Sequence, residues 1–243
     1  MKKTIKITLV LITLFCLTLG CTHSWFNEKI FGNGEITTKT ISTGGYDIIE
    51  GIGFMDIHLE KGTEGDISVT TDNNLHEYIK IEVKDNILIL KTKENFNIET
   101  KMGVHITVPF EVISRVALTG SGNIETEDVI AVNEFTASVT GSGDVVLAVE
   151  ASKVQAIITG SGDITISGST SNLEVNLFGS GDFKGFDLDS QNTNVSVSGS
   201  GDAEVVAKES LVARVNGSGD IIYKGNPDNK NFKTFGSGDI SSY

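Results

Sequence analysis

The sequence has little cysteine, proline, arginine or tryptophan, and each shortage excludes something. Both cysteines among its 243 residues lie within the first 21 positions, so the remainder holds no thiol for a disulfide, a thiolate metal site or a nucleophile. The only prolines, Pro109 and Pro227, leave long strands uninterrupted. The only arginines are Arg115 and Arg214 in a chain of net charge −13, so nucleic acid is excluded as a partner for want of a basic patch.

Residues 1–20 are predicted to be a signal peptide of the lipoprotein type. Three lysines precede an uncharged apolar stretch, residues 7–19, which is too short for a membrane span, and Gly20-Cys21 follows. The segment resembles a bacterial lipoprotein signal, which implies lipidation of Cys21; an ordinary cleaved signal and an uncleaved anchor are the alternatives. Residues 21–34 are then the tether. Removal of residues 1–20 takes away three lysines and no acidic residue, so the mature chain has a net charge of −16. Such an acidic surface suits anionic headgroups poorly, so the lipid should make the membrane attachment.

A tetrapeptide, Gly-Ser-Gly followed by Asp or Asn, recurs at nearly constant spacing in the second half of the chain. Its copies begin at Gly120, Gly141, Gly160, Gly179, Gly199, Gly217 and Gly236. Successive starts are 21, 19, 19, 20, 18 and 19 residues apart, and no helical periodicity appears over residues 116–243. A near-constant period of this length is typical of a solenoid.

The residues around each tetrapeptide alternate between apolar and polar. After the Asp or Asn that ends each tetrapeptide, the first and third residues are mostly apolar. Before the first glycine of each tetrapeptide, the second and fourth residues are mostly apolar as well. This alternation predicts two half-buried strands that meet at a glycine corner in every repeat. Stacked repeats then align like residues about 4.8 Å apart around a continuous interior. The fold predicted is all-β, a right-handed single-stranded parallel β-helix with rungs of about 19 residues.

The first half of the chain contains weaker copies of the same elements. Gly51-Ile52-Gly53 followed by Asp56-Ile57-His58-Leu59 reads as a degenerate corner and strand, and residues 83–88 read as a hairpin with an Asp85-Asn86 turn. The β-helix domain is therefore expected over residues 35–243, with a hairpin excursion in its N-terminal half.

Several short segments, taken with the tetrapeptides, carry a family resemblance. They are Gly45-Tyr46-Asp47-Ile48-Ile49, Asp72-Asn73-Asn74-Leu75 with Tyr78-Ile79, and Val108-Pro109. In these the chain resembles the putative auto-transporter adhesin head GIN domain family over about residues 35–243. The resemblance implies an exported bacterial β-helix protein, often lipid-anchored, with adhesion as its suggested role. It supplies no set of functional residues.

The last residues of the tetrapeptides should form one column along the corner, which we call the Asx column. Its members are Asn123, Asp144, Asp163, Asp182, Asp202, Asp220 and Asp239. One interpretation is a calcium site, but Ca²⁺ takes six to eight oxygens, and a calcium-binding β-roll has turns of a different spacing at both edges. The other is structural, with each side chain capping local backbone N–H groups. We favour the structural interpretation, with a loosely held cation as the alternative and no dedicated metal site.

The sequence offers little sign of catalysis. The histidines, at positions 23, 58, 76 and 105, are not at metal-ligand spacing, and neither a nucleophile elbow nor a phosphate loop occurs. A polysaccharide-cleaving site would need a pair of carboxylates. The candidates for it are Glu125, Glu127, Asp128, Glu174 and Glu204. On so acidic a surface most carboxylates simply face water, so we expect no catalytic residue and no cofactor.

Two exposed aromatic residues and the end of the chain bear on partners. Phe178 and Phe235 precede a Gly-Ser-Gly in the outward register, where they form a candidate recognition patch. The alternative, which we favour, is that they cover a neighbouring loop or a subunit contact, since single exposed apolar residues are common. Tyr243 follows Asp239 by four residues, so the final rung is expected to be incomplete and to leave an unpaired strand edge. We therefore expect that the protein can form homo-oligomers through this open rung.

These observations together predict a non-catalytic, lipid-anchored protein of the bacterial cell envelope, on the periplasmic face or the cell surface. It would act as an adhesin-like binding protein or scaffold for a protein or glycan. The alternative is a polysaccharide-active or calcium-dependent β-helix.

Overall fold

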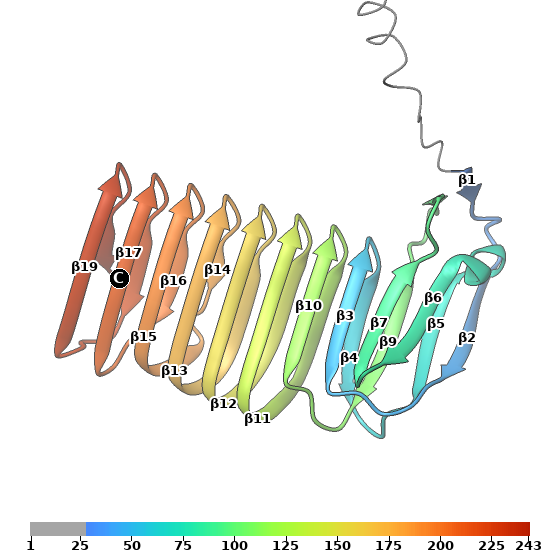
Figure 1. Cartoon of the computed structure of the whole chain (residues 1–243), viewed down its shortest axis with the longest axis horizontal. Helices are drawn as coiled ribbons and strands as arrows, with labels where there is room; N and C mark the ends of the chain where they lie inside the picture. The colour runs from blue at the N-terminus through green and yellow to red at the C-terminus, as the bar shows by residue number, and fades with distance from the viewer. Residues whose placement is uncertain (1–27) are drawn as a thin grey trace, which may run out of the picture.

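The computed structural model describes residues 28–243; the signal peptide, Cys21 and the first part of the tether lie outside the described residues. The chain forms a β-solenoid of about seven turns, whose rungs stack side by side in Figure 1. The elements are β1 (Glu28–Phe31), β2 (Ile36–Ser42), β3 (Ile48–Gly53), β4 (Asp56–Lys61), β5 (Asp66–Asp72), the 3-10 helix η1 (Asn73–Tyr78), β6 (Ile79–Lys84), β7 (Ile87–Thr92), β8 (Phe96–Glu99), β9 (His105–Phe110), β10 (Arg115–Gly120), β11 (Asn123–Gly141), β12 (Asp144–Gly160), β13 (Ile164–Gly179), β14 (Phe183–Lys184), β15 (Leu188–Gly199), β16 (Ala203–Val206), β17 (Ser210–Gly217), β18 (Ile221–Lys224), β19 (Asn229–Gly236) and β20 (Ile240–Ser242). The predicted all-β parallel β-helix with rungs of about 19 residues is confirmed.

Each rung contributes one strand segment to each of two facing layers. Layer A contains β6, β7, β3, β10, the second halves of β11, β12 and β13, and then β15, β17 and β19. Layer B contains β2, β5, β9, β4, the first halves of β11, β12 and β13, and then β14, β16, β18 and β20. The layers join sharply at the tetrapeptide corner and more gently at the opposite edge, where β11, β12 and β13 bend from one layer into the other (Figure 1).

The degenerate corner at residues 51–56 is a true member of the stack. Gly53 aligns with Gly120, and Asp56 aligns with Asn123, so Asp56 extends the Asx column by one rung. On the other side of β3 and β4, strands β7 and β9 form a further rung, which antiparallel β6 and β5 flank. The predicted hairpin is present: β6 and β7 join at Asp85 and Asn86, which have φ of 52° and 63°.

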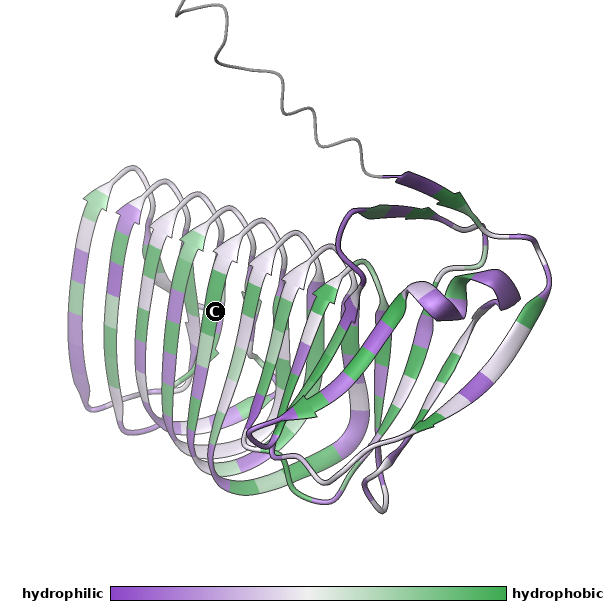
Figure 2. Cartoon of the chain, turned by 45° about the vertical axis from the view of Figure 1, so that its right-hand side comes forward, coloured by the Kyte–Doolittle hydropathy of each residue, from purple (hydrophilic) through white to green (hydrophobic). Residues whose placement is uncertain are grey.

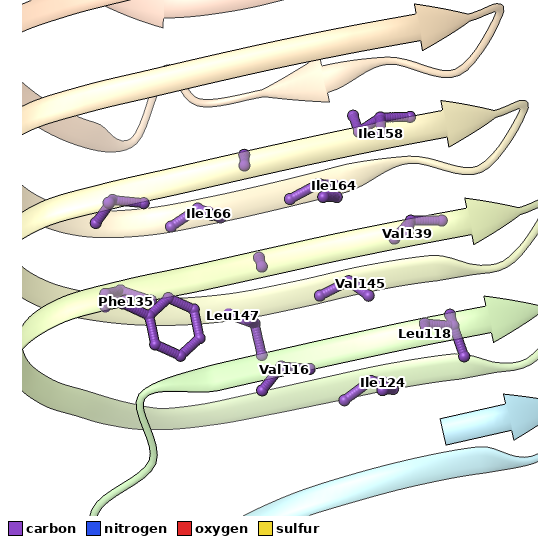
Figure 3. Packing of buried hydrophobic residues seen from close by; sticks show 14 of the residues in the cluster. Val116, Leu118, Ile124, Phe135, Val139, Val145, Leu147, Ile158, Ile164 and Ile166 are labelled. Atoms are coloured by element: carbon purple, nitrogen blue, oxygen red, sulfur yellow. The ribbon is translucent and has the colours of Figure 1, made fainter. Parts of the chain in front are cut away.

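Apolar side chains from both layers fill the space between them. Figure 3 shows residues such as Val116, Leu118 and Ile124 pointing between the layers, and the same positions of the next rungs lie directly above them. Hydrophobic and hydrophilic residues alternate along these strands (Figure 2). The inward positions named by the sequence pattern are buried throughout the central rungs. Full burial of one such side chain contributes about 1.5–3 kcal/mol, so the repeated rows supply the stability that disulfides do not.

The inward positions change character in the last rung. Lys230 lies in register with Leu211, and Thr234 with Val215, while Ser242 lies in register with Tyr223. Within residues 28–243 no strand pairs with the outer side of β19. An inward-pointing charge at a sheet edge discourages edge-to-edge pairing. Lys230 should therefore oppose the homo-oligomerisation that was expected through this rung.

The segment expected to be a tether is partly structured. Residues 28–31 form β1, which pairs in parallel with β8 to give a two-stranded sheet separate from the main one. This small sheet lies at the N-terminal end of the stack (Figure 1). Among residues 28–243 no helix has the length and apolar character needed to cross a membrane.

Candidate functional site: the Asx column and the outer faces

The two glycines of each tetrapeptide are required because neighbouring corners stack backbone against backbone. Gly141 has φ of 124°, a conformation that costs other residues strain. A β-carbon on Gly141 would overlap the carbonyl oxygen of Gly120, and one on Gly143 would overlap that of Gly122. The serine between them is exposed, and its N–H and that of Gly143 both donate to the Gly120 oxygen, at 2.8 and 3.1 Å. The corner is therefore closed by main-chain contacts and exposes only a hydroxyl.

The carboxylates of the Asx column bind the backbone of the neighbouring rung. Oδ1 of Asp144 accepts the N–H of Asp163 at 2.9 Å, and Oδ1 of Asp163 accepts the N–H of Asp182 at 2.8 Å. The same bond repeats from Asp182 to Asp202, from Asp202 to Asp220 and from Asp220 to Asp239, at 2.7–2.8 Å. The sequence predicted caps on local N–H groups; in the structure each N–H belongs to the following rung. The column thus joins the rungs through one oxygen of each of these acceptor carboxylates.

Asn123 and Lys184 moderate the negative charge of the column. The amide of Asn123 donates to Oδ1 of Asp56 at 2.8 Å, so the first contact is not between two carboxylates. The ammonium group of Lys184 lies 2.6 Å from Oδ2 of Asp163. That hydrogen bond, with the charges of Asp163, Asp182 and Asp144, raises the pKa of Lys184.

The arrangement of its oxygens bears on whether the column is structural or holds a cation. Across the described part of the chain, no group of three or more His, Cys, Asp or Glu residues has an arrangement that could hold a metal ion. With Oδ1 of each acceptor carboxylate bonded to backbone, the geometry supports the structural interpretation.

A groove of about 500 Å³ begins where the column reaches the N-terminal rungs. Here the structure brings together two histidines that lie far apart in the sequence. Nδ1 of His105 is 3.7 Å from Oδ2 of Asp56, and Nδ1 of His58 is 3.9 Å from Oε1 of Glu125. Nε2 of His105 donates to the carbonyl of Met102 at 2.7 Å, which leaves Nδ1 facing the carboxylate. Sequence spacing missed this cluster because β9 joins the stack through a long excursion; only the Asp56 alignment with later corners pointed toward it.

The two aromatic residues expected to form a patch lie in one outward row of layer A, but not side by side. Phe178 and Phe235 are 50% and 66% exposed. Ser198 and Asn216 occupy the two intervening rungs, so the rings are three rungs, or about 14 Å, apart. They are two separate aromatic platforms with polar residues between them.

The outward side chains of layer A lie in four rows. The row farthest from the tetrapeptide corner contains Glu134, Lys153, Asn172, Asn192, Ser210 and Asn229. The other three run from β10 to β19, and we call them face A. These three rows are Arg115, Thr136, Gln155, Glu174, Asn194, Val212 and Asn231; Ala117, Ser138, Ile157, Asn176, Ser196, Arg214 and Lys233; and Thr119, Thr140, Thr159, Phe178, Ser198, Asn216 and Phe235. Hydroxyl and amide groups dominate, and both arginines of the chain lie here. A shallow pocket of about 200 Å³ lies at the margin of face A, where Asn172, Asn192 and Ser210 line it together with Glu174, Asn194 and Val212 of the first row.

The outward side of layer B contrasts with face A because it is acidic. It carries the Asx column and, in the next outward row, Glu125 and Glu204 with Lys184 between them. Of the carboxylates considered for catalysis, Glu174 lies on face A, and Glu125 and Glu204 are four rungs, or about 19 Å, apart. Glu127 and Asp128 lie next to Glu125 along β11, and Oδ2 of Asp128 accepts the N–H of Lys61 at 2.7 Å.

Taken together, the fold and these surfaces define a β-solenoid protein, whose interior is filled by apolar side chains, whose corners bond to one another through the backbone, and whose two outer faces differ in charge. The chain belongs to the family described as putative auto-transporter adhesin, head GIN domain, whose model matches residues 45–227. The family resemblance in the sequence is therefore confirmed. No curated protein matches the chain.

Several solved bacterial structures share the fold. A putative adhesin from Bacteroides fragilis has a TM-score of 0.81 at 22% identity, covering 88% of this chain and 100% of that one. A putative lipid binding protein from Parabacteroides distasonis has a TM-score of 0.74 at 26% identity, and a putative adhesin from the same organism 0.74 at 27%; each covers 89% of this chain and 100% of its own. Family and fold support an adhesin-like role.

Proposed function

We propose that this chain is an exported, lipid-anchored protein of the bacterial cell envelope that binds an uncharged glycan on face A. The observation that carries the binding proposal is the charge difference between the two outer faces. The mature chain carries about one negative charge per fourteen residues, at −16 over residues 21–243, yet the charged side chains of face A are only Arg115, Glu174, Arg214 and Lys233. Three of these side chains are cations and one is a carboxylate, so face A lacks the negative charge that the rest of the surface carries. A partner on this face therefore does not meet the negative potential that covers the acidic side of layer B.

The groups on face A match the chemistry of a polyol. Hydroxyl and amide side chains can donate and accept hydrogen bonds with sugar hydroxyls, while an exposed ring supplies an apolar platform. Phe178 has this setting, since Thr159 and Ser198 flank it in the adjacent rungs and Asn176 lies in the neighbouring row. Glu174 is already engaged by Lys153 at 3.5 Å and by the amide of Asn176 at 3.3 Å, so it adds little free negative charge.

Binding without catalysis is the proposal, because glycoside hydrolysis requires two carboxyl groups about 5–9.5 Å apart across the substrate. Face A has a single carboxylate, Glu174, and the other carboxylate on this side of layer A, Glu134, lies two rungs and one row away, at about 12 Å. The alternative of a calcium-dependent protein would use the Asx column, where Oδ1 of each acceptor aspartate already binds a backbone N–H.

The glycan proposal is tested on immobilised oligosaccharides, both neutral and sialylated or sulfated, with full-length protein extracted from membranes. We expect binding to neutral glycans that changes little between low and high salt, because screening weakens only charge interactions. Phe178→Ala should weaken it at least about tenfold, equivalent to about 1.4 kcal/mol. Val146→Ala is the matched control, since Val146 is an apolar residue 46% exposed on layer B. Equal loss in both variants, or binding confined to anionic glycans, would reject face A as a neutral-glycan site.

Export and anchoring are supported by the signal pattern, by the cysteine at position 21 and by the absence of other thiols from the mature chain. The test is the mass and the membrane association of the mature protein. Lipidation at Cys21 predicts an acylated N-terminal peptide and recovery with membranes, and Cys21→Ala should abolish both. An unmodified N-terminus in the wild-type protein would exclude the lipid anchor.

A further inference from the structure

The small sheet of β1 and β8 is held rigidly against the N-terminal end of the β-helix. Asp72, which is 2% exposed, joins the two parts: Oδ1 accepts the N–H of Gly34 and Oδ2 accepts the hydroxyl of Thr100, both at 2.6 Å. The amide of Asn74 donates to the carbonyl of Phe31 at 2.9 Å, and the N–H of Gly32 donates to the carbonyl of Glu99 at 2.8 Å. The position of Phe31 is therefore fixed relative to the rungs.

Two large apolar side chains project from this end. Phe31 is 61% exposed and Met102 is 59% exposed, and both line one pocket of about 430 Å³ with Gly32, Gly34 and Lys101. The nearest charges of the sheet largely cancel, because Lys29 lies 2.6 Å from Glu99. The pair of exposed apolar residues, the pocket and the balanced charge distinguish this end from the acidic side of layer B.

The proposed lipid on Cys21 would bring this end close to a bilayer. Only six residues, 22–27, separate Cys21 from Glu28, the first residue of β1, so the two are seven Cα–Cα steps apart. Even fully extended, such a segment spans no more than about 25 Å. The segment includes Trp25 and Phe26, and aromatic residues favour the boundary between hydrocarbon and water. β19 is at the opposite end of the stack (Figure 1), so the rungs would extend away from the membrane.

We propose that Phe31 and Met102 form a membrane-contacting foot, which inserts into the lipid interface and sets the orientation of the β-helix on the envelope. This inference rests on the proposed lipid anchor. The occupant of the pocket is the lipid surface itself. Apolar side chains contribute binding energy in proportion to the area that they bury in the acyl boundary, and a second membrane signal stabilises a lipid anchor.

The test places a single tryptophan at chosen positions. The protein has one tryptophan, so Trp25→Phe removes the native signal and Phe31→Trp introduces a new one. The full-length lipidated protein is reconstituted into phosphatidylcholine vesicles that contain brominated lipids, which quench tryptophan on contact. Trp25→Phe with Phe178→Trp is the matched control, since Phe178 is similarly exposed but lies on face A.

We expect the fluorescence of the Phe31→Trp protein to be quenched at least about twofold more than that of the Phe178→Trp protein, and Met102→Trp to behave like Phe31→Trp. Protein that floats with the vesicles but shows equal quenching at positions 31 and 178 would overturn the foot while leaving the anchor intact. Wild-type protein that does not float with the vesicles would overturn the anchor, and the foot with it.

Discussion

The Asx column yields a quantitative prediction at Asp182, in the middle of the stack. Its Oδ1 accepts the N–H of Asp202 at 2.8 Å, and its own N–H donates to Asp163 at 2.8 Å. Each neighbouring carboxylate, about 4.8 Å away, repels it by about 0.9 kcal/mol in water. The ammonium group of Lys184, whose pKa is raised by its hydrogen bond to Asp163 and by the charge of Asp182, offsets part of this repulsion. Asp182 therefore combines a stabilising hydrogen bond with a charge that two neighbouring carboxylates repel.

Two substitutions separate these contributions. Asp182→Asn removes the charge and keeps an oxygen acceptor, so we expect stability equal to or above that of the wild type. Asp182→Ala removes both, and the N–H of Asp202 loses its acceptor. The difference between the variants is then one hydrogen bond to a neutral acceptor, about 0.5–1.5 kcal/mol, or about 1–6 °C in the unfolding midpoint of a domain of this size.

The assays are urea unfolding, which gives the free-energy difference, and thermal unfolding, which gives the midpoint in °C, both followed by circular dichroism. Glu204→Gln and Glu204→Ala form the matched control pair, because Glu204 lies on the same side of layer B without a corresponding bond, and we expect them to differ little. If Asp182→Asn destabilised the protein as much as Asp182→Ala, the charge itself would be required, and the explanation of the column as an inter-rung acceptor would be refuted.

Three further predictions concern the corner, the N-terminal junction and the open rung. Gly143→Ala should cost at least about 2 kcal/mol, because its β-carbon meets the Gly122 carbonyl, whereas Gly44→Ala, with no atom within 4 Å, should be nearly neutral in the same unfolding assay; similar midpoints would show that corners can move apart. Hydrogen bonds from Thr100 and Gly34 lower the pKa of Asp72, so its stabilisation is complete above the unfolded-state value of about 3.9 and is lost as pH falls through the lower folded-state pKa. Asp72→Asn should therefore flatten the acid limb of stability against pH, and an unchanged acid limb would contradict this role. Lys230→Leu together with Thr234→Val should promote the homo-oligomerisation suggested by the open rung, detected by sedimentation as a concentration-dependent increase in mass, and a wild-type protein that associates more strongly than the variant would show that Lys230 does not oppose pairing.

The central rungs could be predicted from the sequence because every relevant contact repeats. Residues such as Ile124, Val145 and Ile164 occupy one register position, so a single alignment identifies the interior of the whole stack. The glycine corner was predictable for the same reason. The positive φ and close approach at Gly141 are what Gly-Ser-Gly supplies in each copy.

The N-terminal half could be predicted only in part because its pairing is non-local. The alignment of Asp56 with Asn123 and the hairpin at Asp85-Asn86 follow from short motifs. β9 pairs with β4 and so brings His105 beside Asp56. Five elements lie between these two strands in the chain, and because none of them repeats at a fixed spacing, the pairing could not be predicted from the sequence. The pairing of β1 with β8 likewise had no sequence signal.

The candidate site was predictable in composition but not in geometry. The members of the Asx column were identified, yet the choice between a local and an inter-rung N–H depends on corner conformation rather than on residue type. Phe178 and Phe235 were recognised as outward, but their separation by Ser198 and Asn216 becomes evident only when the rungs are counted along the stack.

The most direct test of the account is to measure binding of the full-length protein to immobilised neutral oligosaccharides in calcium and in a chelator, and to compare Phe178→Ala with Asp182→Asn. The account predicts that binding is the same in both solutions, survives Asp182→Asn and is lost with Phe178→Ala. Binding that requires calcium, disappears with Asp182→Asn and persists with Phe178→Ala would transfer the function from face A to the Asx column.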